Sequence, residues 1–261
     1  GEVLGSILGV LSTIDFVDTV EVLLKRQDPD LERRVLRLLE NRLGENPDND
    51  RASQHRVLEF TSTLVEIIRS SDDILLKHAA VACVDRIAEK YGKKDTGRVV
   101  EAAQVIAGDA CIGQSDTRIR VMGVLCLASM VDVLGEAIIP ALPEILQRSL
   151  SLLEDSITGD ETNEELHNAV YTLLSALLVQ IPFMLSSKNL DQILLLSGKS
   201  AAADLSDESD DARRDALKLL AKKVDVKESF GVVERNWQAV VAQGPTAVKE
   251  SLEVVSIAIE K

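Results

Sequence analysis

The sequence repeats one short phrase at a nearly constant spacing, and this repetition constrains the fold more than any other feature. Residues 115–123 read SDTRIRVMG, and related phrases are SDDILLKHA at 71–79 and SDDARRDAL at 209–217. A period of about 40–47 residues with two helices per unit is typical of HEAT or armadillo arrays, in which neighbouring units cover each other's apolar faces. The repetition therefore predicts an all-α protein.

The residues that open these phrases fix the period. Asp30, Asp73 and Asp116 stand 43 positions apart, and Asp210 follows 94 positions after Asp116. Asn163 lies halfway between Asp116 and Asp210. Asp and Asn are good helix N-caps, so we expect each opener to begin a helix. A basic or potentially basic residue follows each opener by four positions, namely Arg34, Lys77, Arg120, His167 and Arg214. We expect this base to pair with an opener of its own or an adjacent repeat.

The helical periodicity divides the chain into helix pairs. We predict a HEAT-repeat α-solenoid, a superhelix of about six two-helix repeats, as a single array over 1–261 that is a fragment of a longer solenoid. The approximate repeats are 12–45, 50–92, 95–135, 136–185, 187–224 and 226–261. The last helix carries an apolar stripe of Leu252, Val255 and Ile259, whereas a terminal repeat needs a polar outer face. This stripe is the reason for predicting a longer array.

Composition is consistent with stacked helices. Hydrophobic residues make up 46% of the chain and aromatic residues only 3%, which indicates a core of Leu, Ile, Val and Ala. Leu125 is expected in that core, where truncation to alanine costs about 2–5 kcal/mol. No uninterrupted apolar run reaches the length of a membrane span, and the chain begins with Gly without a leader pattern, so neither a membrane span nor a signal peptide is expected.

The cysteines and histidines do not form a recognisable reactive site. Cys83, Cys111 and Cys126 are odd in number and unevenly spaced, which predicts buried free thiols in a reducing compartment. The sequence contains no HExxH, CxxC, GxGxxG or GxxxxGK motif. We therefore predict no catalytic residue, no metal site, no cofactor and no small-molecule substrate. His78, which lies in a repeated phrase, is interpreted as structural.

Two longer segments resemble a known family. They are LGEAIIPALPEILQRSLSLLED at 134–155 and NAVYTLLSALLVQIPFMLSSKNLDQIL at 168–194. Together they resemble the C-terminal part of the large HEAT-repeat scaffold of the small-subunit processome, the small-nucleolar-RNA-associated protein of the UtpA (t-UTP) subcomplex. The likeness extends over about residues 95–195 and is weaker outside that range. The Asp-x-x-apolar-basic phrases also resemble the second helix of HEAT repeats.

The resemblance implies a non-enzymatic scaffold in ribosome biogenesis. Such a protein would act in the nucleus, in the nucleolus, on processing of the small-subunit rRNA precursor and on rRNA transcription. Its partners would be other protein subunits of a large pre-ribosomal ribonucleoprotein.

The charge argues against direct RNA contact by this segment. The formal net charge is −14, and phosphate contacts require Lys and Arg. Local basic clusters, such as Arg118 with Arg120, leave such contact open. The acidic stretches 153–165 and 204–211 are either solvated loops between helices or docking sites for basic tails. The candidate partner-binding residues are Arg33, Arg37, Arg118, Asp207, Glu208 and Trp237. Trp237 has two interpretations, an interface anchor or a core residue.

Two other classes of function remain open at this point. A nuclear transport receptor or a cohesin or chromatin regulator would share the architecture and the negative charge, and would bind basic partner proteins. A helical enzyme would need an enclosed pocket with convergent polar groups.

Overall fold

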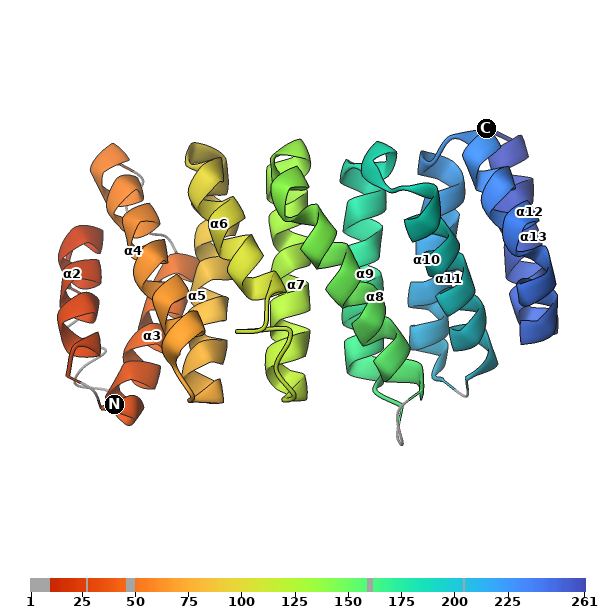
Figure 1. Ribbon diagram of the computed structural model, residues 1–261. Helices are drawn as coiled ribbons and strands as arrows, with labels where there is room; N and C mark the ends of the chain where they lie inside the picture. The colour runs from red at the N-terminus through yellow and green to blue at the C-terminus, as the bar shows by residue number, and fades with distance from the viewer. Residues whose placement is uncertain (1–9, 27, 46–49, 159–161, 204) are drawn as a thin grey trace. The chain divides into compact units, whose positions relative to one another are not determined.

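A computed structural model describes the whole chain except residues 1–9, 27, 46–49, 159–161 and 204. It divides into two compact units, Gly1–Ala141 and Leu142–Lys261, which are described separately. All regular elements in the described residues are helices (Figure 1). The prediction of an all-α fold is confirmed.

In its described residues, the first unit contains three consecutive helix pairs and two short 3-10 helices. Its elements are α2 (Thr13–Leu24), α3 (Pro29–Glu45), α4 (Arg51–Ser70), α5 (Ile74–Tyr91), η1 (Gly92–Lys94), α6 (Thr96–Ala107), α7 (Thr117–Leu134) and η2 (Gly135–Ala141). The described part of the second unit also contains three pairs. Its elements are α8 (Leu142–Thr158), α9 (Glu164–Gln180), η3 (Pro182–Met184), α10 (Ser187–Ala202), α11 (Asp207–Lys223), α12 (Val226–Gln243) and α13 (Pro245–Ile259).

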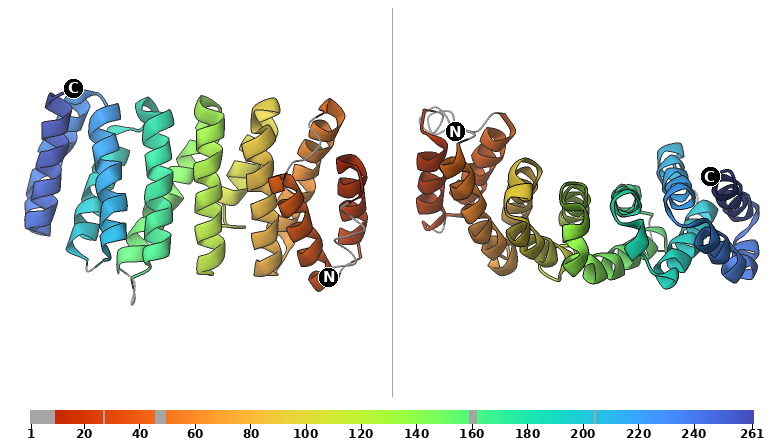
Figure 2. Two further views of the ribbon diagram at one scale, coloured as in Figure 1. Left: turned by 180° about the vertical axis from the view of Figure 1, so that it is seen from behind. Right: turned by 90° about the horizontal axis from the view of Figure 1, so that it is seen from above.

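Packing between pairs follows one rule within each unit. The first helix of a pair packs on the first helix of the next pair, as α2 on α4, α4 on α6, α8 on α10 and α10 on α12. The second helices do the same, as α3 on α5, α5 on α7, α9 on α11 and α11 on α13. Each unit therefore has two layers of helices, which Figure 2 shows from behind and from above. This arrangement is typical of HEAT and armadillo repeats.

The predicted helix caps are right in three of five repeats. Asp73, Asp116 and Asn163 are N-caps whose side chains accept hydrogen bonds from backbone N–H groups of α5, α7 and α9. Asp30 is not a cap: α3 begins one residue earlier, at Pro29, and Asp28 accepts the N–H bonds of Asp30 and Leu31. Proline has a fixed φ that suits the first helical position, so it moves the start of this helix.

The opener of the fifth phrase lies inside a helix. Ser206 caps α11 by accepting the N–H of Ser209, and Asp210 follows within the first turn. Serine caps a helix about as well as aspartate does, so the earlier serine is used.

The bases four positions after the openers do not pair with the opener carboxylates. Lys77, which is buried, donates from Nζ to the carbonyl of Ala110 at 2.8 Å, and Arg120 donates to the carbonyl of Gln114. Arg214 donates to the backbone carbonyl of Asp210 at 3.2 Å. The prediction that these bases pair with an opener carboxylate is wrong, because their side chains donate to backbone carbonyls instead.

The core face of α7 differs by one position from the prediction. Leu125 is 41% exposed, whereas Val124, Cys126 and Leu127 are fully buried. The assignment of Leu125 to the core is therefore wrong. Gly123 permits the close approach of the preceding loop, since a Cβ atom there would lie 2.5 Å from Ile112 Cγ2.

The three cysteines are free and buried, as predicted. Burial raises the pKa of the Cys111 thiol to about 12, and it also raises the pKa of the Cys83 and Cys126 thiols. Thiols of this kind stay protonated and unreactive at neutral pH.

One helical stretch of the described residues, Thr117–Thr158, is long and apolar enough to cross a membrane by length and composition. Its most apolar window has a mean hydropathy of 1.9, and 50% of that window is buried inside the protein. The α7 part of the stretch packs against α5 and α6. A helix that is apolar around most of its circumference is typical of a protein core.

The two positions on α7 give a matched test of the packing. We expect Leu127→Ala to lower the free energy of unfolding by about 2–5 kcal/mol, because the side chain is fully buried. Leu125→Ala should change it by less than about 1 kcal/mol, because that side chain is exposed. Urea denaturation followed by circular dichroism measures both values. Equal losses in the two variants would contradict the assigned core face.

Candidate interaction surfaces

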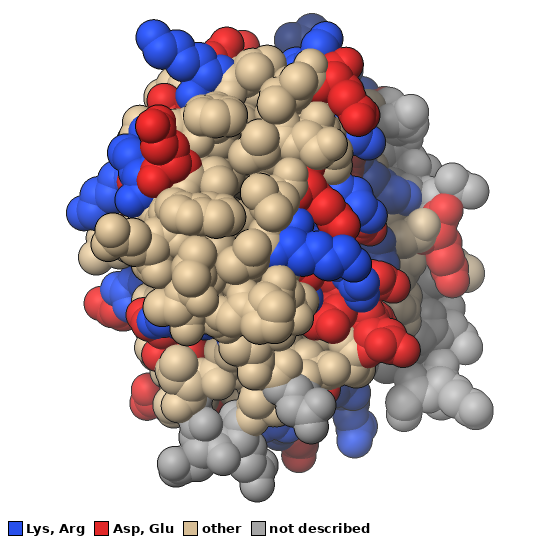
Figure 3. All heavy atoms as spheres, turned by 90° about the vertical axis from the view of Figure 1, so that its right-hand side faces the viewer, with Lys and Arg blue, Asp and Glu red and all other residues tan. Residues whose placement is uncertain are grey.

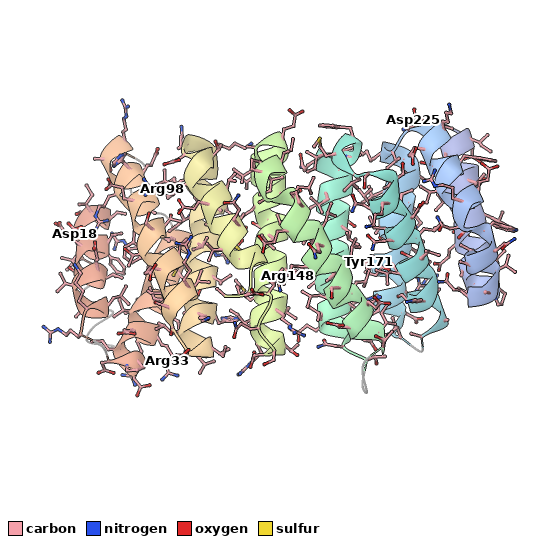
Figure 4. All side chains as sticks on the ribbon, viewed as in Figure 1. Asp18, Arg33, Arg98, Arg148, Tyr171 and Asp225 are labelled. Carbon is pink, nitrogen blue, oxygen red and sulfur yellow. The ribbon has the colours of Figure 1, made fainter. Side chains whose placement is uncertain are left out.

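Ion pairs connect the first helices of successive pairs in the first unit. Arg56 on α4 reaches back to α2, where its Nε lies 2.7 Å from Asp18 Oδ1 and its Nη2 contacts Glu21. Arg98 on α6 reaches back to α4 and donates from Nη1 to Ser62 Oγ at 3.1 Å. Figure 4 labels Asp18 and Arg98. In both of these contacts the later helix provides the cation and the earlier helix provides the acceptor. The longer ion pair between Arg69 of α4 and Glu101 of α6, at 3.9 Å, has the opposite order.

In the second unit, too, the later helix provides the cation. Lys199 on α10 lies 2.5 Å from Glu154 on α8, and Arg235 on α12 lies 3.0 Å from Asp191 on α10. Asn236 donates to the same Asp191 carboxylate at 2.8 Å. Most of these pairs are partly exposed, and such pairs contribute about 0–1 kcal/mol each. Their main effect is therefore on the register of one pair against the next.

A buried polar network joins α9, α10, α11 and α13. The guanidinium of Arg213, with 1% of its side chain exposed, donates from Nε and Nη2 to both carboxylate oxygens of Glu250 at 3.0 and 2.8 Å. Its Nη1 lies 2.5 Å from Asp210, and Ser200 Oγ lies 2.6 Å from His167 Nε2. Burial lowers the pKa of His167, so its imidazole is neutral at neutral pH.

A neighbouring hydrogen bond extends this network. The hydroxyl of Tyr171, labelled in Figure 4, lies 3.0 Å from Ser197 Oγ on α10. The network is structural, because its members are satisfied by one another and all of those named except Asp210, which is 33% exposed, are buried.

Removing one member of the buried ion pair gives the second prediction. Glu250→Gln leaves the buried Arg213 with Asp210 as its remaining carboxylate, so we expect a loss of about 3 kcal/mol in the free energy of unfolding. The exposed-pair control Arg235→Gln should cost less than about 1 kcal/mol. Urea denaturation at neutral pH measures both, and a cost for Glu250→Gln no greater than the control would contradict a buried, stabilising pair.

A half-buried carboxyl lies in the seam between α5 and α7. Asp85 accepts hydrogen bonds from Ser129 and Cys126, but desolvation dominates and raises its pKa to about 6. Its Oδ1 atom is buried and has no hydrogen-bond partner among the described residues. The negative charge of Asp85 therefore destabilises this seam at neutral pH.

The third prediction follows from the sign of this shift. The folded protein binds a proton at Asp85 at a higher pH than the unfolded chain does, so the destabilisation is present above pH 6 and disappears as the pH falls toward 4. Asp85→Asn should raise the free energy of unfolding at pH 7.5 by about 1–2 kcal/mol. This gain is smaller than the full pKa difference between the folded and unfolded states would give, because the carboxyl is partly solvated. At pH 4 the two proteins should be equally stable. Thermal melts across this pH range test it, and a destabilised Asp85→Asn protein at pH 7.5 would contradict it.

The predicted partner-binding arginines lie in the first unit. Arg33 on α3 pairs with Asp30 at 2.7 Å and with Asp73 of α5 at 3.5 Å, so it links two repeats (Figure 4). Arg118, 65% exposed at the start of α7, pairs with its N-cap Asp116 at 2.8 Å. Arg37 is exposed on α3. Of these three, Arg33 and Arg118 have intramolecular partners, and Arg37 stays a candidate for binding.

The other predicted residues lie in the second unit. Asp207 and Glu208 are exposed in the first turn of α11, where carboxylates also stabilise the positive end of the helix. Trp237 on α12 is 39% exposed, so the interpretation as a core residue is wrong and its ring is available at the surface. The structure does not group Trp237 with the acidic pair, which lies on a different helix.

One exposed apolar surface was missed by the sequence analysis. Val226, Phe230, Trp237 and Val241 recur along one side of α12 and are 38%, 48%, 39% and 50% exposed. Their spacing of four, seven and four positions was a visible signal. It was not used, because an apolar stripe on a repeat helix is normally assigned to the core.

Comparison with solved structures identifies the class of protein. A designed armadillo repeat protein superposes with a TM-score of 0.65, over 95% of this chain and 100% of that chain, at 14% identity. Kap121p bound to RanGTP superposes with a TM-score of 0.54 over 94% of this chain and 26% of that chain, also at 14% identity. These likenesses show the fold alone: the chain is an armadillo/HEAT-type repeat solenoid.

Comparison of sequences shows to which proteins the chain is related. U3 small nucleolar RNA-associated protein 10 of Aspergillus clavatus is 63% identical over 260 residues, which is 100% of this chain and 14% of the relative. The proteins of the same name from Neosartorya fischeri and Emericella nidulans are 62% and 55% identical, again over 14% of their length. No protein-family model matches the chain. The resemblance to the small-nucleolar-RNA-associated scaffold is confirmed, and it extends over the whole chain.

Proposed function

We propose that this chain is a non-enzymatic scaffold segment in ribosome biogenesis, part of a subunit of the small-subunit processome. The observation that supports this function is the 63% identity, along the whole chain, to a protein whose name associates it with U3 small nucleolar RNA. The chain acts in the nucleolus, on processing of the small-subunit rRNA precursor and on rRNA transcription. Within the processome we assign it to the UtpA subcomplex.

The domain organisation is proposed on the same basis. The chain, 1–261, is one HEAT-repeat array with repeats at 12–45, 50–92, 95–135, 136–185, 187–224 and 226–261, and this array is a portion of a longer solenoid. The length of the relatives supports this proposal, since the chain spans 14% of each.

The partners are proposed to be protein subunits of the pre-ribosomal particle. A net charge of −14 disfavours contact with an RNA backbone. Two of the predicted basic residues are further neutralised, Arg33 by Asp30 and Asp73, and Arg118 by Asp116. An open array of helix pairs presents a large surface relative to its mass, which suits a protein that holds several partners.

The alternative of a nuclear transport receptor is not favoured. Kap121p shares the fold at 14% identity, whereas the relatives that share more than half of the residues carry the U3-associated name. A repeat fold of this kind supports many unrelated functions, so sequence identity decides between the two classes.

The fourth prediction tests the proposed function. Affinity purification of the polypeptide that carries this segment, followed by cross-linking mass spectrometry, should recover processome subunits cross-linked to lysines of residues 12–261. Deletion of these residues should reduce processing of the small-subunit rRNA precursor. Recovery of nucleoporins or cohesin subunits in place of processome subunits would overturn the proposal.

A further inference from the structure

The outer face of the last helix pair is apolar along its whole length. We define the α12–α13 face as Val226, Phe230, Trp237 and Val241 on α12 with Val248, Leu252, Val255 and Ile259 on α13. Leu252 and Ile259 are 52% and 67% exposed. Figure 3 views the molecule from this side and shows uncharged residues across the middle, with charged residues around them.

The two stripes meet at a hollow. It has a volume of ≈ 670 Å³ and is lined by Val241, Pro245, Val248 and Leu252, among others. An exposed apolar patch of this kind, rimmed by polar residues, indicates an interaction site.

The equivalent face of the preceding pair, α10 with α11, is covered by α12 and α13. Gly198 on α10 and Trp237 on α12 both lie 12 positions after the N-caps of their helices, Ser186 and Asp225. Gly198 is buried under the next pair, since a Cβ atom there would lie 1.8 Å from Gln243 Oε1 and 3.3 Å from Ala247 Cβ. The position of Trp237 is therefore the position at which a helix pair receives its successor.

Other equivalent positions agree. Asp191 on α10 corresponds to Phe230 and is contacted by Arg235 of α12. Arg214 and Leu217 on α11 correspond to Leu252 and Val255, and both line a small cavity against α13. At Phe230, Trp237, Leu252 and Val255, the α12–α13 face therefore corresponds to positions that the next helix pair contacts within this unit.

The ion pairs between first helices add a charge preference. At α4 on α2, α10 on α8 and α12 on α10, the later helix supplies Arg or Lys and the earlier helix supplies the carboxylate. At α6 on α4 the order is reversed, with Arg69 of α4 3.9 Å from Glu101 of α6. Glu234 is exposed on the outer side of α12, at the position that corresponds to Leu195, whose carbonyl accepts a bond from Gln243 of α12. Glu234 is thus placed to accept such a cation.

We propose that the α12–α13 face binds one further helix pair of the same polypeptide, with an apolar inner face and an Arg or Lys opposite Glu234 on its first helix. Relatives about seven times as long as this chain, of which it spans 14%, support an occupant from the same polypeptide over a separate protein. This inference rests on the proposed longer array. It does not depend on the processome assignment, so the two can fail separately.

Cysteine labelling tests the occupant. Leu252→Cys places a thiol on the face, and Lys222→Cys places a matched control on the exposed side of α11. The native thiols are buried, so their background is low. In the 261-residue chain both introduced cysteines should react rapidly with a maleimide. In the purified longer polypeptide, at high dilution, the cysteine of Leu252→Cys should react at least about tenfold more slowly than in the 261-residue chain. The reaction rate of Lys222→Cys should be the same in both.

A charge reversal tests the ion pair. Glu234→Arg should raise the labelling rate of Leu252→Cys in the longer polypeptide about two- to fivefold, the effect of losing a partly exposed ion pair, and leave the rate in the 261-residue chain unchanged. Equal labelling of Leu252→Cys in the two polypeptides would overturn the proposal. The proposal would also be overturned if Leu252→Cys became protected in the 261-residue chain as its concentration rises and sedimentation showed a dimer. That result would mean that a second copy of the chain covers the face. Protection of the longer polypeptide only when other proteins are added would also overturn it, because a separate partner would then cover the face.

Discussion

No helix pair in this protein can bury its own apolar surface, and the rest of the structure depends on that constraint. Two helices leave an apolar side that solvent would reach, and the packing of first helix on first helix and second helix on second helix covers it with the next pair. Leu and Ala side chains at these contacts allow close approach, which explains a large apolar fraction with few aromatic residues. The hydrophobic effect supplies the stability of this packing. Because each pair must cover the one before it, the apolar pattern recurs in the sequence once per pair.

Polar contacts decide how one pair sits on the next. Apolar packing tolerates small shifts, whereas a bidentate pair such as Arg213 with Glu250 is satisfied in one arrangement only. The partly exposed ion pairs between first helices also favour one register of a pair on the next, but each contributes less free energy. Asp85 shows the opposite case, a carboxyl whose burial in the α5–α7 seam opposes folding at neutral pH. Register is thus specified by a few buried or half-buried charges in each unit.

These features suit a scaffold. The described residues present exposed charged and apolar side chains on helices that are held in place by their neighbours, so the spacing of binding groups is set by the repeat. The hollow on the α12–α13 face is open and lined mainly by apolar side chains, as expected for a packing surface. The relatives carry a name that associates them with U3 small nucleolar RNA, and the chain's own negative charge directs the proposal toward protein partners.

The sequence by itself determined the helical class, the repeat phrase, the buried free cysteines and the family resemblance, because each depends on local pattern. Asp73, Asp116 and Asn163 were recognisable as caps from their position alone. Only the tertiary structure decided which side of each helix is covered. Leu125 and Trp237 have the same apolar character as core residues, and they are exposed because no described helix packs over them. Likewise Ala110, the partner of Lys77, and Glu250, the bidentate partner of Arg213, lie more than 30 positions away, and residue spacing cannot reveal a contact that exists only after neighbouring pairs have packed.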